Sequence, residues 1–497
     1  MSLLGIDIGT SGCKAAAFNA EGACLASASR EYASIHAHAH RAELDSQFVW
    51  NCIKEIIALV AQQTAADPIE ALCVSTMGEA ATPVTRNRCI IGNCILSSDT
   101  RGIEFIDQLR QRIDQESFYR INPNILGPNY TLPKLLWLRE HEPERFNRTY
   151  KFLLWDGLVG FLAGTEPFIS FSNANRTLLF DIQRETWSDH LLSLVDLDPQ
   201  LLPRCLPGGT IAGGVSRRIA DELGLPLDVK IIVGGHDQCC NALGAGIAQP
   251  GRAVDGIGTF ECITPVYAKL PAPHFMLEHG LNIEHHVLPG LYVSFLYNQG
   301  GSLIRWFRDT FAFEMRNNSN IYEQLTEEMP SEPTRLFVLP YFEMTGPPAF
   351  VSDASGVIIG LKTTTRRSEI LKAIMESVTF YFFQSLRALN EIGIDTSEFV
   401  ATGGGAKSDA WLQIKADILG VPFKRTRYTE CGLVGAAILA GVATGAFNHA
   451  EDGIACLVRE DRTFEPDPRR HEIYQSRIER YQRLFPLLRG FLSSNEA

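Results

Sequence analysis

A short motif that occurs twice constrains the fold of this chain more than any other feature. Residues 5–10 read Gly-Ile-Asp-Ile-Gly-Thr, and residues 255–260 read Asp-Gly-Ile-Gly-Thr-Phe. An internal repeat indicates related structural units. A chain of 497 residues is also too long for one hydrophobic core. We therefore expect two related halves, residues 1–247 and residues 248–497, with Gly256 in the second copy where the first has Asp7.

The N-terminal copy of the motif predicts a β-hairpin. Residues 3–8 are apolar enough for a buried strand, residues 9–12 read Gly-Thr-Ser-Gly, and residues 14–18 resume a strand pattern. A P-loop instead needs a strand that leads into a helix through a Gly-Lys step, and this dipeptide does not occur in the sequence. The pattern therefore excludes a Walker A site.

Strand and helix patterns alternate along the rest of the chain. Asp45 is a candidate cap for a helix that continues to residue 60. Residues 71–76 and 229–233 read as strands, the second of which stops at Gly234, and residues 238–246 open a helix. Ser408 is the candidate cap of a helix that ends at Gly420. This alternation predicts an α/β architecture.

The turn of the first hairpin offers groups that suit phosphate oxygens. Gly9 and Gly12 expose backbone amides, Thr10 and Ser11 add hydroxyls, and Lys14 adds a positive charge. The alternative is an ordinary hairpin turn, which turn statistics alone favour.

Asp7 lies in the apolar strand just before that turn. A buried carboxylate is costly unless it is paired or lies near a cation. An Mg²⁺ ion held mostly through water would satisfy it. A hydrogen-bonded carboxylate that braces the turn is the alternative, and the residues alone do not choose between the two.

Asp237 lies where a predicted strand meets a predicted helix. Open α/β folds place ligands at the carboxyl ends of strands, and a helix N-terminus keeps a carboxylate ionised and able to accept a proton. The alternative is a plain helix N-cap. Residues 402–406 form a glycine-rich loop before a helix, which suits a nucleotide, with a tight strand-to-helix turn as the alternative.

In combination and in this order, the motifs resemble those of the FGGY family of carbohydrate kinases. The resemblance covers almost the whole chain and implies two duplicated actin-like (ribonuclease H-like) domains flanking a nucleotide cleft. Its motifs are residues 5–11, 95–101, 172–181, 234–238, 258–259, 299–302, 403–417 and 430–437. The segment Leu96-Ser97-Ser98-Asp99 lacks the family's usual Trp, which puts the identity of the substrate in doubt more than the catalysis.

The resemblance implies transfer of the γ-phosphoryl group of MgATP to a primary hydroxyl of a sugar or polyol. Asp237 would accept the hydroxyl proton, and Asp7 and Asp237 would hold Mg²⁺, partly through water. The expected nucleotide and phosphate contacts are Gly9, Thr10, Ser11, Lys14, Gly258, Thr259, Gly301, Gly403, Gly404, Gly405 and Ala406.

The resemblance also places an acceptor site. Met77, Gly78 and Glu79 occupy the position where related kinases vary, and a Glu79 carboxylate would accept hydrogen bonds from two hydroxyls. The alternative for Glu79 is a residue of a surface loop. Trp155 and Asp156 match a segment that reaches the sugar, and the indole would either stack on a sugar face or pack in the core.

A ketopentose such as xylulose is the expected substrate class. Ribulose, glycerol, another polyol or a sugar acid such as gluconate stay open within the family. An actin-like ATPase without a sugar substrate is the alternative from another class, because a fold alone does not fix a function.

Composition bounds the partners. The net charge of −12 argues against nucleic acid or an anionic membrane. No apolar run reaches the length of a membrane span, and the N-terminus lacks a signal-peptide pattern, so we expect a cytoplasmic protein. The 12 Cys are scattered, and we expect reduced thiols. Family resemblance favours a homodimer. His36, His38 and His40 would share one face of an extended segment, but no partner is fixed by spacing, and no metal is assigned to them.

Overall fold

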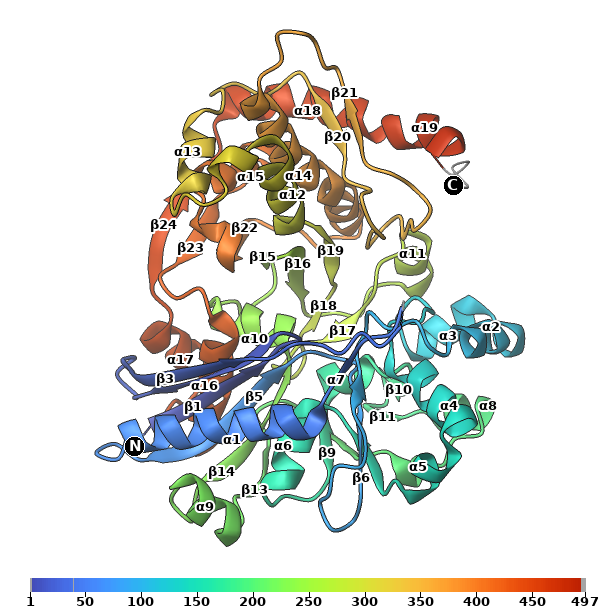
Figure 1. Cartoon of the computed structure of the whole chain (residues 1–497), viewed down its shortest axis with the longest axis vertical. Helices are drawn as coiled ribbons and strands as arrows, with labels where there is room; N and C mark the ends of the chain where they lie inside the picture. The colour runs from blue at the N-terminus through green and yellow to red at the C-terminus, as the bar shows by residue number, and fades with distance from the viewer. Residues whose placement is uncertain (1, 39, 493–497) are drawn as a thin grey trace.

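The computed structural model describes residues 2–38 and 40–492. Two bodies lie one above the other along the long axis of the molecule (Figure 1). The lower body contains the first part of the chain, and the upper body contains most of the second part. The red helices α16 (Cys431–Thr444) and α17 (Ala450–Leu457) return to lie beside the lower body.

The first body is built on a six-stranded sheet with the order β13-β14-β5-β1-β2-β3. The three central strands β14, β5 and β1 are parallel, and the other pairs are antiparallel. The strands are β1 (Ser2–Ile8), β2 (Gly12–Phe18), β3 (Cys24–Glu31), β5 (Ile69–Thr76), β13 (Ile211–Gly214) and β14 (Lys230–His236).

The second sheet repeats the same topology. Its path β24-β23-β22-β15-β16, continued by β19 on β16, has three parallel central strands and antiparallel pairs outside them. Two small strands, β17 (Glu284–His285) and β18 (Tyr292–Val293), extend its edge. The main strands are β15 (Arg252–Ile257), β16 (Phe260–Tyr267), β19 (Leu296–Gln299), β22 (Glu398–Thr402), β23 (Phe423–Thr426) and β24 (Glu460–Phe464). The duplication predicted from the motif is therefore a duplication of whole sheets.

The strand register confirms the alignment of the two motifs. Asp7 lies opposite Ser75 across the parallel pair β1–β5, and Gly256 lies opposite Thr402 across the parallel pair β15–β22. The position that holds a carboxylate in the first half thus holds no side chain in the second.

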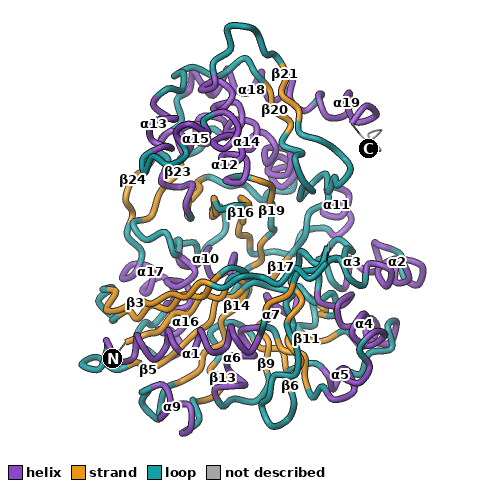
Figure 2. Tube along the Cα trace, viewed as in Figure 1, coloured by secondary structure: helices purple, strands orange, loops and turns teal. Residues whose placement is uncertain are grey.

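Helices cover both sheets, and Figure 2 shows them gathered above the second sheet. In the first part of the chain they are α1 (Ser46–Gln63), α2 (Ile103–Arg112), α3 (Gln115–Ile121), α4 (Thr131–His141), α5 (Pro143–Arg148), α6 (Trp155–Ala163), α7 (Phe171–Asn175), α8 (Asp189–Leu194), α9 (Arg217–Leu223) and α10 (Asp237–Gly244). The later ones are α11 (Pro273–Glu278), α12 (Gly301–Phe311), α13 (Ile321–Glu327), α14 (Arg367–Glu391), α15 (Asp409–Leu419), α18 (Pro468–Gln482) and α19 (Leu484–Leu492), besides α16 and α17.

Short strand pairs and 3₁₀ turns complete the chain. The pairs are β4 (Glu43–Leu44) with β7 (Cys94–Ile95), β6 (Thr82–Val84) with β8 (Lys151–Leu153), β9 (Phe168–Ser170) with β12 (Arg204–Leu206), β10 (Phe180–Asp181) with β11 (Thr186–Trp187), and β20 (Phe337–Leu339) with β21 (Val357–Ile359). The 3₁₀ turns are Pro199–Leu201, Phe313–Met315 and Gly404–Lys407.

Local sequence explains where these elements begin and end. The side chain of Asp45 caps α1 by accepting from the Phe48 N–H, as predicted. Ser408 caps α15 in the same way. The predicted end of β14 at Gly234 is wrong, because Gly235 and His236 continue to pair with β5 after an irregularity in the register.

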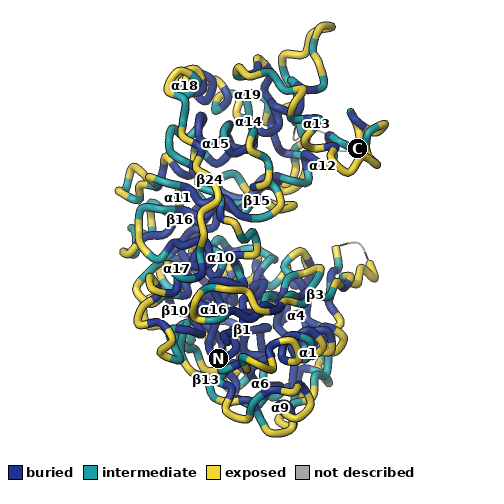
Figure 3. Tube along the Cα trace, turned by 90° about the vertical axis from the view of Figure 1, so that its left-hand side faces the viewer, coloured by how far each residue is buried: buried dark blue, intermediate teal, exposed yellow. Residues whose placement is uncertain are grey.

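Four apolar clusters hold the layers together. One face of the first sheet packs against α1, α6 and α9, and the opposite face packs against α10 and α16. The second sheet packs against α12, α14, α15 and α18, and the helices α2 to α5 and α8 form a cluster of their own. Figure 3 shows the buried strands as dark blue segments inside both bodies.

Helices α10 and α16 touch backbone to backbone. A Cβ on Gly435 would lie 2.0 Å from the Cys240 carbonyl oxygen, and one on Gly244 would lie 1.8 Å from the Cys431 carbonyl oxygen. Gly5 of β1 is equally close to the Leu433 carbonyl oxygen, at 2.2 Å. Glycine is therefore required at these three positions so that α16 can lie directly on α10 and β1.

The division of the chain at residue 247 stays a prediction. Residue 247 falls between α10 and β15, but α16 from the second half packs on the first sheet. In residues 2–38 and 40–492, no helix combines the length and apolar character that crossing a membrane requires.

Gly435→Ala should lower the free energy of unfolding by about 1–3 kcal/mol, because the added methyl group overlaps the backbone of α10. Thermal melting measures the loss. Gly490→Ala in α19 is the matched control, since no atom lies within 4 Å of the added Cβ. It should leave the melting temperature unchanged or slightly higher. Equal melting temperatures for Gly435→Ala and the wild type would contradict the packing described.

Candidate active site

The predicted catalytic side chains meet where the parallel strands of the first sheet end. Strands β1, β5 and β14 point the same way, so the turn after Ile8, the loop after Thr76 and the start of α10 lie along one edge. This is the edge at which open α/β sheets bind ligands. Asp7, Glu79 and Asp237 all lie there.

Asp7 is held by the neighbouring strand. Its Oδ1 accepts a hydrogen bond from Ser75 Oγ at 2.6 Å. Burial raises the pKa of Asp7 to about 7; the Ser75 hydrogen bond and the charge of Lys14 lower it, and the charges of Asp237 and Glu430 raise it. The predicted alternative, a hydrogen-bonded carboxylate that braces the turn, is met in its hydrogen bond, but that bond runs to β5 and not to the turn.

Asp237 is the first residue of α10 and does not cap it. The cap is His236, whose Nδ1 accepts from the Gln238 N–H at 3.2 Å. The Asp237 side chain is 34% exposed, and its Oδ1 lies 3.0 Å from His236 Nδ1. Burial opposes the charge of His236, but the Asp237 carboxylate outweighs it and raises the pKa of that imidazole. The N-cap alternative for Asp237 is therefore wrong, and its carboxylate faces the open edge.

The charges at this edge fit a divalent cation. The Asp7, Asp237 and Glu430 carboxylates act on one another, and Lys14 is the cation among them. Lys14 Nζ is itself paired with Glu430 Oε2 at 2.6 Å. Among the described residues no group of three His, Cys, Asp or Glu side chains has the arrangement of a metal site. Two carboxylates completed by water and phosphate oxygens are the usual environment of Mg²⁺ in kinases.

The turn at residues 9–12, predicted to bind phosphate, is exposed and is held by hydrogen bonds. The Gly9 N–H donates to the Gly12 carbonyl at 2.9 Å, and Tyr32 Oη donates to the Gly9 carbonyl at 2.8 Å. Thr10 and Ser11 are exposed at its tip.

The turn at Gly258 and Thr259, also predicted to bind phosphate, lies against the N-terminus of α12. Gly258 and Thr259 are exposed, but their carbonyls accept hydrogen bonds from the first N–H groups of α12. The Gly301 N–H donates to the Gly258 carbonyl at 2.9 Å. The backbone amide of Gly301 is thus committed to the turn, and a contact of Gly301 with the nucleotide stays a prediction.

The glycine-rich loop forms a 3₁₀ turn before α15. Gly403 has a φ of +78° and lies against the Ile257 backbone, where a Cβ would be 2.9 Å from the carbonyl oxygen. Gly404 is exposed with no atom within 4 Å of an added Cβ. The Ala406 side chain is fully buried, so its methyl group packs in the core and cannot contact a nucleotide.

Glu79 belongs to a buried polar cluster and not to a surface loop. Its side chain is 7% exposed, and its Oε1 accepts from Arg176 Nε at 2.6 Å. Arg176 Nη1 reaches Glu284 Oε1 at 2.8 Å, and the guanidinium lies 4.7 Å from the Tyr130 ring centroid. Asn124 Oδ1 accepts a weaker bond from Arg176. The surface-loop alternative is therefore wrong, and Glu79 keeps its second oxygen for another donor.

Three predicted acceptor residues do not reach the edge. Trp155 is fully buried in the core behind the first sheet, so its indole packs there and cannot stack on a sugar. Asp156 is 1% exposed, and its oxygens accept from the Gly157 and Ser170 N–H groups. Met77 packs in the same core as Trp155. Gly78 does lie at the edge, where a Cβ would be 2.8 Å from the His236 ring.

Several residues at the edge carried no signal that singled them out. Ser75 is one of many strand residues, and Glu284 lies in a short strand of the second half. Arg176 stood inside a family motif without a role of its own. The contact between Arg176 and Glu79 marks both residues, but it is visible only in the folded structure and not in the sequence.

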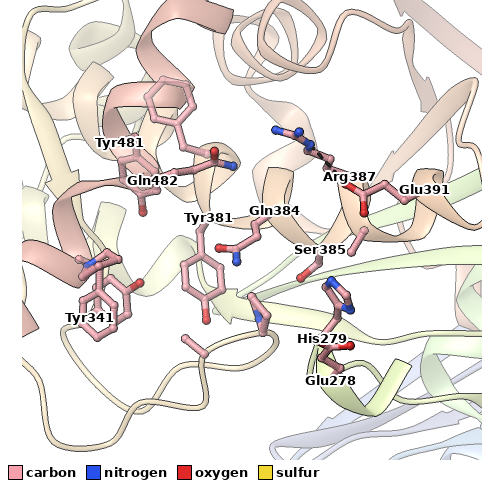
Figure 4. A pocket seen from close by; sticks show the side chains of 16 residues that line it. Glu278, His279, Tyr341, Tyr381, Gln384, Ser385, Arg387, Glu391, Tyr481 and Gln482 are labelled. Atoms are coloured by element: carbon pink, nitrogen blue, oxygen red, sulfur yellow. Dashed lines mark ion pairs between the residues drawn. The ribbon is translucent and has the colours of Figure 1, made fainter. Parts of the chain in front are cut away.

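Other features lie away from this edge. A cavity of about 530 Å³ between α14, α18 and α19 is lined by Tyr341, Tyr381 and Tyr481, with Arg387 paired to Glu391 at its rim (Figure 4). No predicted site residue lines it. His36 is exposed, and its Nδ1 lies 3.2 Å from the Arg41 carbonyl oxygen. His40 has a φ of +63°, so the segment with the three histidines is not extended throughout.

Two sheets of one topology, with carboxylates where the parallel strands end, define the actin-like class of nucleotide-binding folds. Models of the N-terminal and C-terminal domains of the FGGY family of carbohydrate kinases match residues 2–244 and 263–444. The chain belongs to this family and is a carbohydrate kinase.

Similar proteins agree with this assignment. The chain is 29% identical to xylulose kinase of Bacillus subtilis, over 97% of this chain and 96% of that protein. It is also 29% identical to glycerol kinase of a Janthinobacterium species, over 93% of this chain and 94% of that protein. The crystal structure of xylulose kinase from Rhodospirillum rubrum superposes with a TM-score of 0.90 at 26% identity and covers 99% of both chains. The predicted family and fold class are confirmed.

Asp7→Asn should stabilise the metal-free protein increasingly as the pH rises. The pKa of Asp7 in the folded protein, about 7, lies above its ordinary value of 3.8, so the protonated form favours folding. The free energy of unfolding of the wild type therefore decreases as the pH rises from about 3.8 to about 7. An asparagine at this position does not ionise, so the variant does not lose stability in this way. After allowance for solvent at the open edge, the gain at about pH 8 should be ~1–3 kcal/mol.

Thermal melts in a chelator across this pH range measure the effect. Addition of Mg²⁺ and ADP should raise the melting temperature of the wild type more than that of Asp7→Asn. If Asp7→Asn and the wild type had the same melting temperature at every pH, the pKa of Asp7 would not be raised in the folded protein.

Proposed function

We propose that this kinase transfers the γ-phosphoryl group of MgATP to a primary hydroxyl of a ketopentose such as xylulose, with Asp237 as the general base. The observation that carries the proposal is the Asp237 carboxylate, which is exposed at the edge because His236 has taken over the capping of α10. A base must be free to approach the proton that it accepts.

The nucleotide would bind across the two halves. The turn at Gly9, Thr10 and Ser11 supports contacts with phosphate oxygens from the first half, and the turn at Gly258 and Thr259 supports them from the second. Lys14 would reach the phosphates by exchanging its partner Glu430. The loop with Gly403, Gly404 and Gly405 would hold the rest of the nucleotide, with its backbone and not with the Ala406 side chain.

Asp7 and Asp237 are the side chains that would hold Mg²⁺. When bound, the ion supplies positive charge to the phosphate oxygens during transfer. The bond from Ser75 orients the Asp7 carboxylate. Burial first, and then the charges of Asp237 and Glu430, raise the pKa of Asp7, and a cation beside it would favour its ionised form.

The acceptor would bind beside Glu79. Its free oxygen would accept hydrogen bonds from substrate hydroxyls, while Arg176 holds the other oxygen. The cluster contains two carboxyl groups for one guanidinium, so a carboxylate on the substrate would meet Glu79 and Glu284. This charge favours an uncharged sugar over a sugar acid.

Glycerol is the second candidate acceptor, because the chain is as similar to glycerol kinase of the Janthinobacterium species as it is to xylulose kinase of Bacillus subtilis, at 29% identity. An ATPase without a sugar substrate is not retained, since the chain is a carbohydrate kinase. A homodimer and an absence of nucleic acid partners stay predictions.

Asp237→Asn should abolish phosphoryl transfer while the protein still folds and binds nucleotide. Loss of a general base costs about 10²–10⁴-fold in kcat. Calorimetric titration with ADP in a chelator should give nearly the wild-type affinity, because without Mg²⁺ the nucleotide does not depend on the Asp237 carboxylate. Asp107→Asn, an exposed acid on α2 paired with Arg110, is the control and should keep full activity. Near-normal turnover by Asp237→Asn would refute the assigned base.

A substrate panel tests the acceptor. Xylulose, glycerol and gluconate would be compared by kcat/KM with MgATP, and xylulose should exceed the other two by at least about tenfold. Glu79→Gln should raise KM for the preferred sugar by about tenfold, as one charged hydrogen bond is lost. Equal use of gluconate and xylulose would overturn the charge argument for the acceptor pocket.

A further inference from the structure

Three ionisable side chains form a buried cluster in the second half that the proposed chemistry does not use. Lys415 Nζ lies 3.0 Å from Asp255 Oδ2 and 2.5 Å from Glu261 Oε1. All three side chains are fully buried. Buried ion pairs rarely add stability over apolar packing of the same shape, so such a cluster is better explained by what it positions.

The cluster joins the two nucleotide segments of the second half. Asp255 lies on β15 and Glu261 lies on β16, so they stand on the two arms of the hairpin whose turn holds Gly258 and Thr259. Lys415 lies on α15, the helix that begins directly after the glycine-rich loop. The Lys415 ammonium group therefore pairs with both strands of the β15–β16 hairpin, and Lys415 itself lies on α15, which follows the glycine-rich loop.

Close packing leaves little freedom between these segments. A Cβ on Gly405 would lie 2.2 Å from Ile257 Cγ2, so the loop rests directly on the end of β15. On the far side of the hairpin, a Cβ on Gly300 would lie 3.3 Å from Glu261 Oε2. A shift of either arm would therefore move the loop, the turn and the start of α12 together.

The charge of the cluster depends on Lys415. Two carboxyl groups face one ammonium group, and burial together with the charge of Asp255 raises the pKa of Glu261 to about 8. Asp255 Oδ1 and Glu261 Oε2 accept no hydrogen bond among the described residues. Without Lys415, the Asp255 carboxylate would be buried with no cation beside it, and the hairpin arms would have to move to admit water.

We infer that Lys415 is a positioning residue for the nucleotide, which holds the phosphate hairpin and the glycine-rich loop at the separation that MgATP requires. The inference rests on the proposed function, because that proposal assigns the nucleotide to these two segments. Glu79 and Arg176, the acceptor residues proposed here, lie in the first half and do not contact Lys415, so the effect of Lys415 falls on the nucleotide and spares the sugar.

Lys415→Met tests the inference. The variant should raise KM for ATP and the Kd for MgADP by about tenfold or more, and should leave KM for the sugar within about twofold of the wild type. Calorimetric titration with MgADP in the absence of sugar gives the first value, and steady-state kinetics gives the two KM values. A general loss of stability would not separate the two substrates in this way.

A second variant covers the case in which Lys415→Met fails to fold. Asp255→Asn combined with Lys415→Met removes the ammonium group together with one of its two carboxylate partners, and burial, which raises the pKa of Glu261, favours the neutral form of the remaining carboxyl group. It should regain most of the melting temperature and still bind MgADP weakly, since the link from α15 to the hairpin is absent.

Lys372→Met is the matched control. Lys372 is also a buried lysine, but it lies on α14 and donates to the Pro330 and Ser331 carbonyls. It should lower the melting temperature without changing the Kd for MgADP. An unchanged Kd in the double variant, or an equal rise in Lys372→Met, would overturn the role of Lys415. A wild-type protein that binds no MgADP would instead refute the proposed function.

Discussion

The backbone contact between α10 and α16 is the constraint on which the rest of the structure depends. Glycines 244 and 435 let the two helices approach until no Cβ fits between them, and Gly5 lets β1 join the same contact. Both helices begin at the catalytic edge: α10 begins with Asp237, and α16 begins beside Asp7, where a Cβ on Gly432 would lie 3.1 Å from Asp7 Oδ1. Helix N-termini favour negative charge, so this contact gathers two positive helix ends where phosphates and carboxylates must coexist.

The two sheets have the same topology but have kept different chemistry. The first carries Asp7 and leads into Asp237, and both carboxylates lie at an edge that is open to solvent. At the position of Asp7 the second sheet has Gly256, and its acids are withdrawn into the interior around Lys415. In the proposed function, the first half thus supplies the reactive carboxylates and the second supplies the turns that bind the nucleotide. A negative triphosphate is better received by turns whose acids are already neutralised than by turns with free carboxylates.

Much of the fold was predictable because its signals are local. The repeated motif, the caps at Asp45 and Ser408, and the absence of a Gly-Lys step required only neighbouring residues. The errors arose where a decision depends on distant partners. The sequence did not reveal that β14 continues to His236, that His236 and not Asp237 caps α10, or that Trp155 faces the core. The pairing of Glu79 with Arg176 was equally hidden, because 97 residues separate the two.

The ion pair between Arg176 and Glu284 has a consequence for exchanges between relatives. Arg176 belongs to the segment matched by the N-terminal family model and Glu284 to the segment matched by the C-terminal one. The wall of the proposed acceptor pocket is therefore assembled from both matched segments. A chimera that joins the first domain of one kinase to the second domain of another would break this wall at a buried charge. The proposed function therefore predicts that the substrate preference of this chain depends on both domains and does not move with one of them.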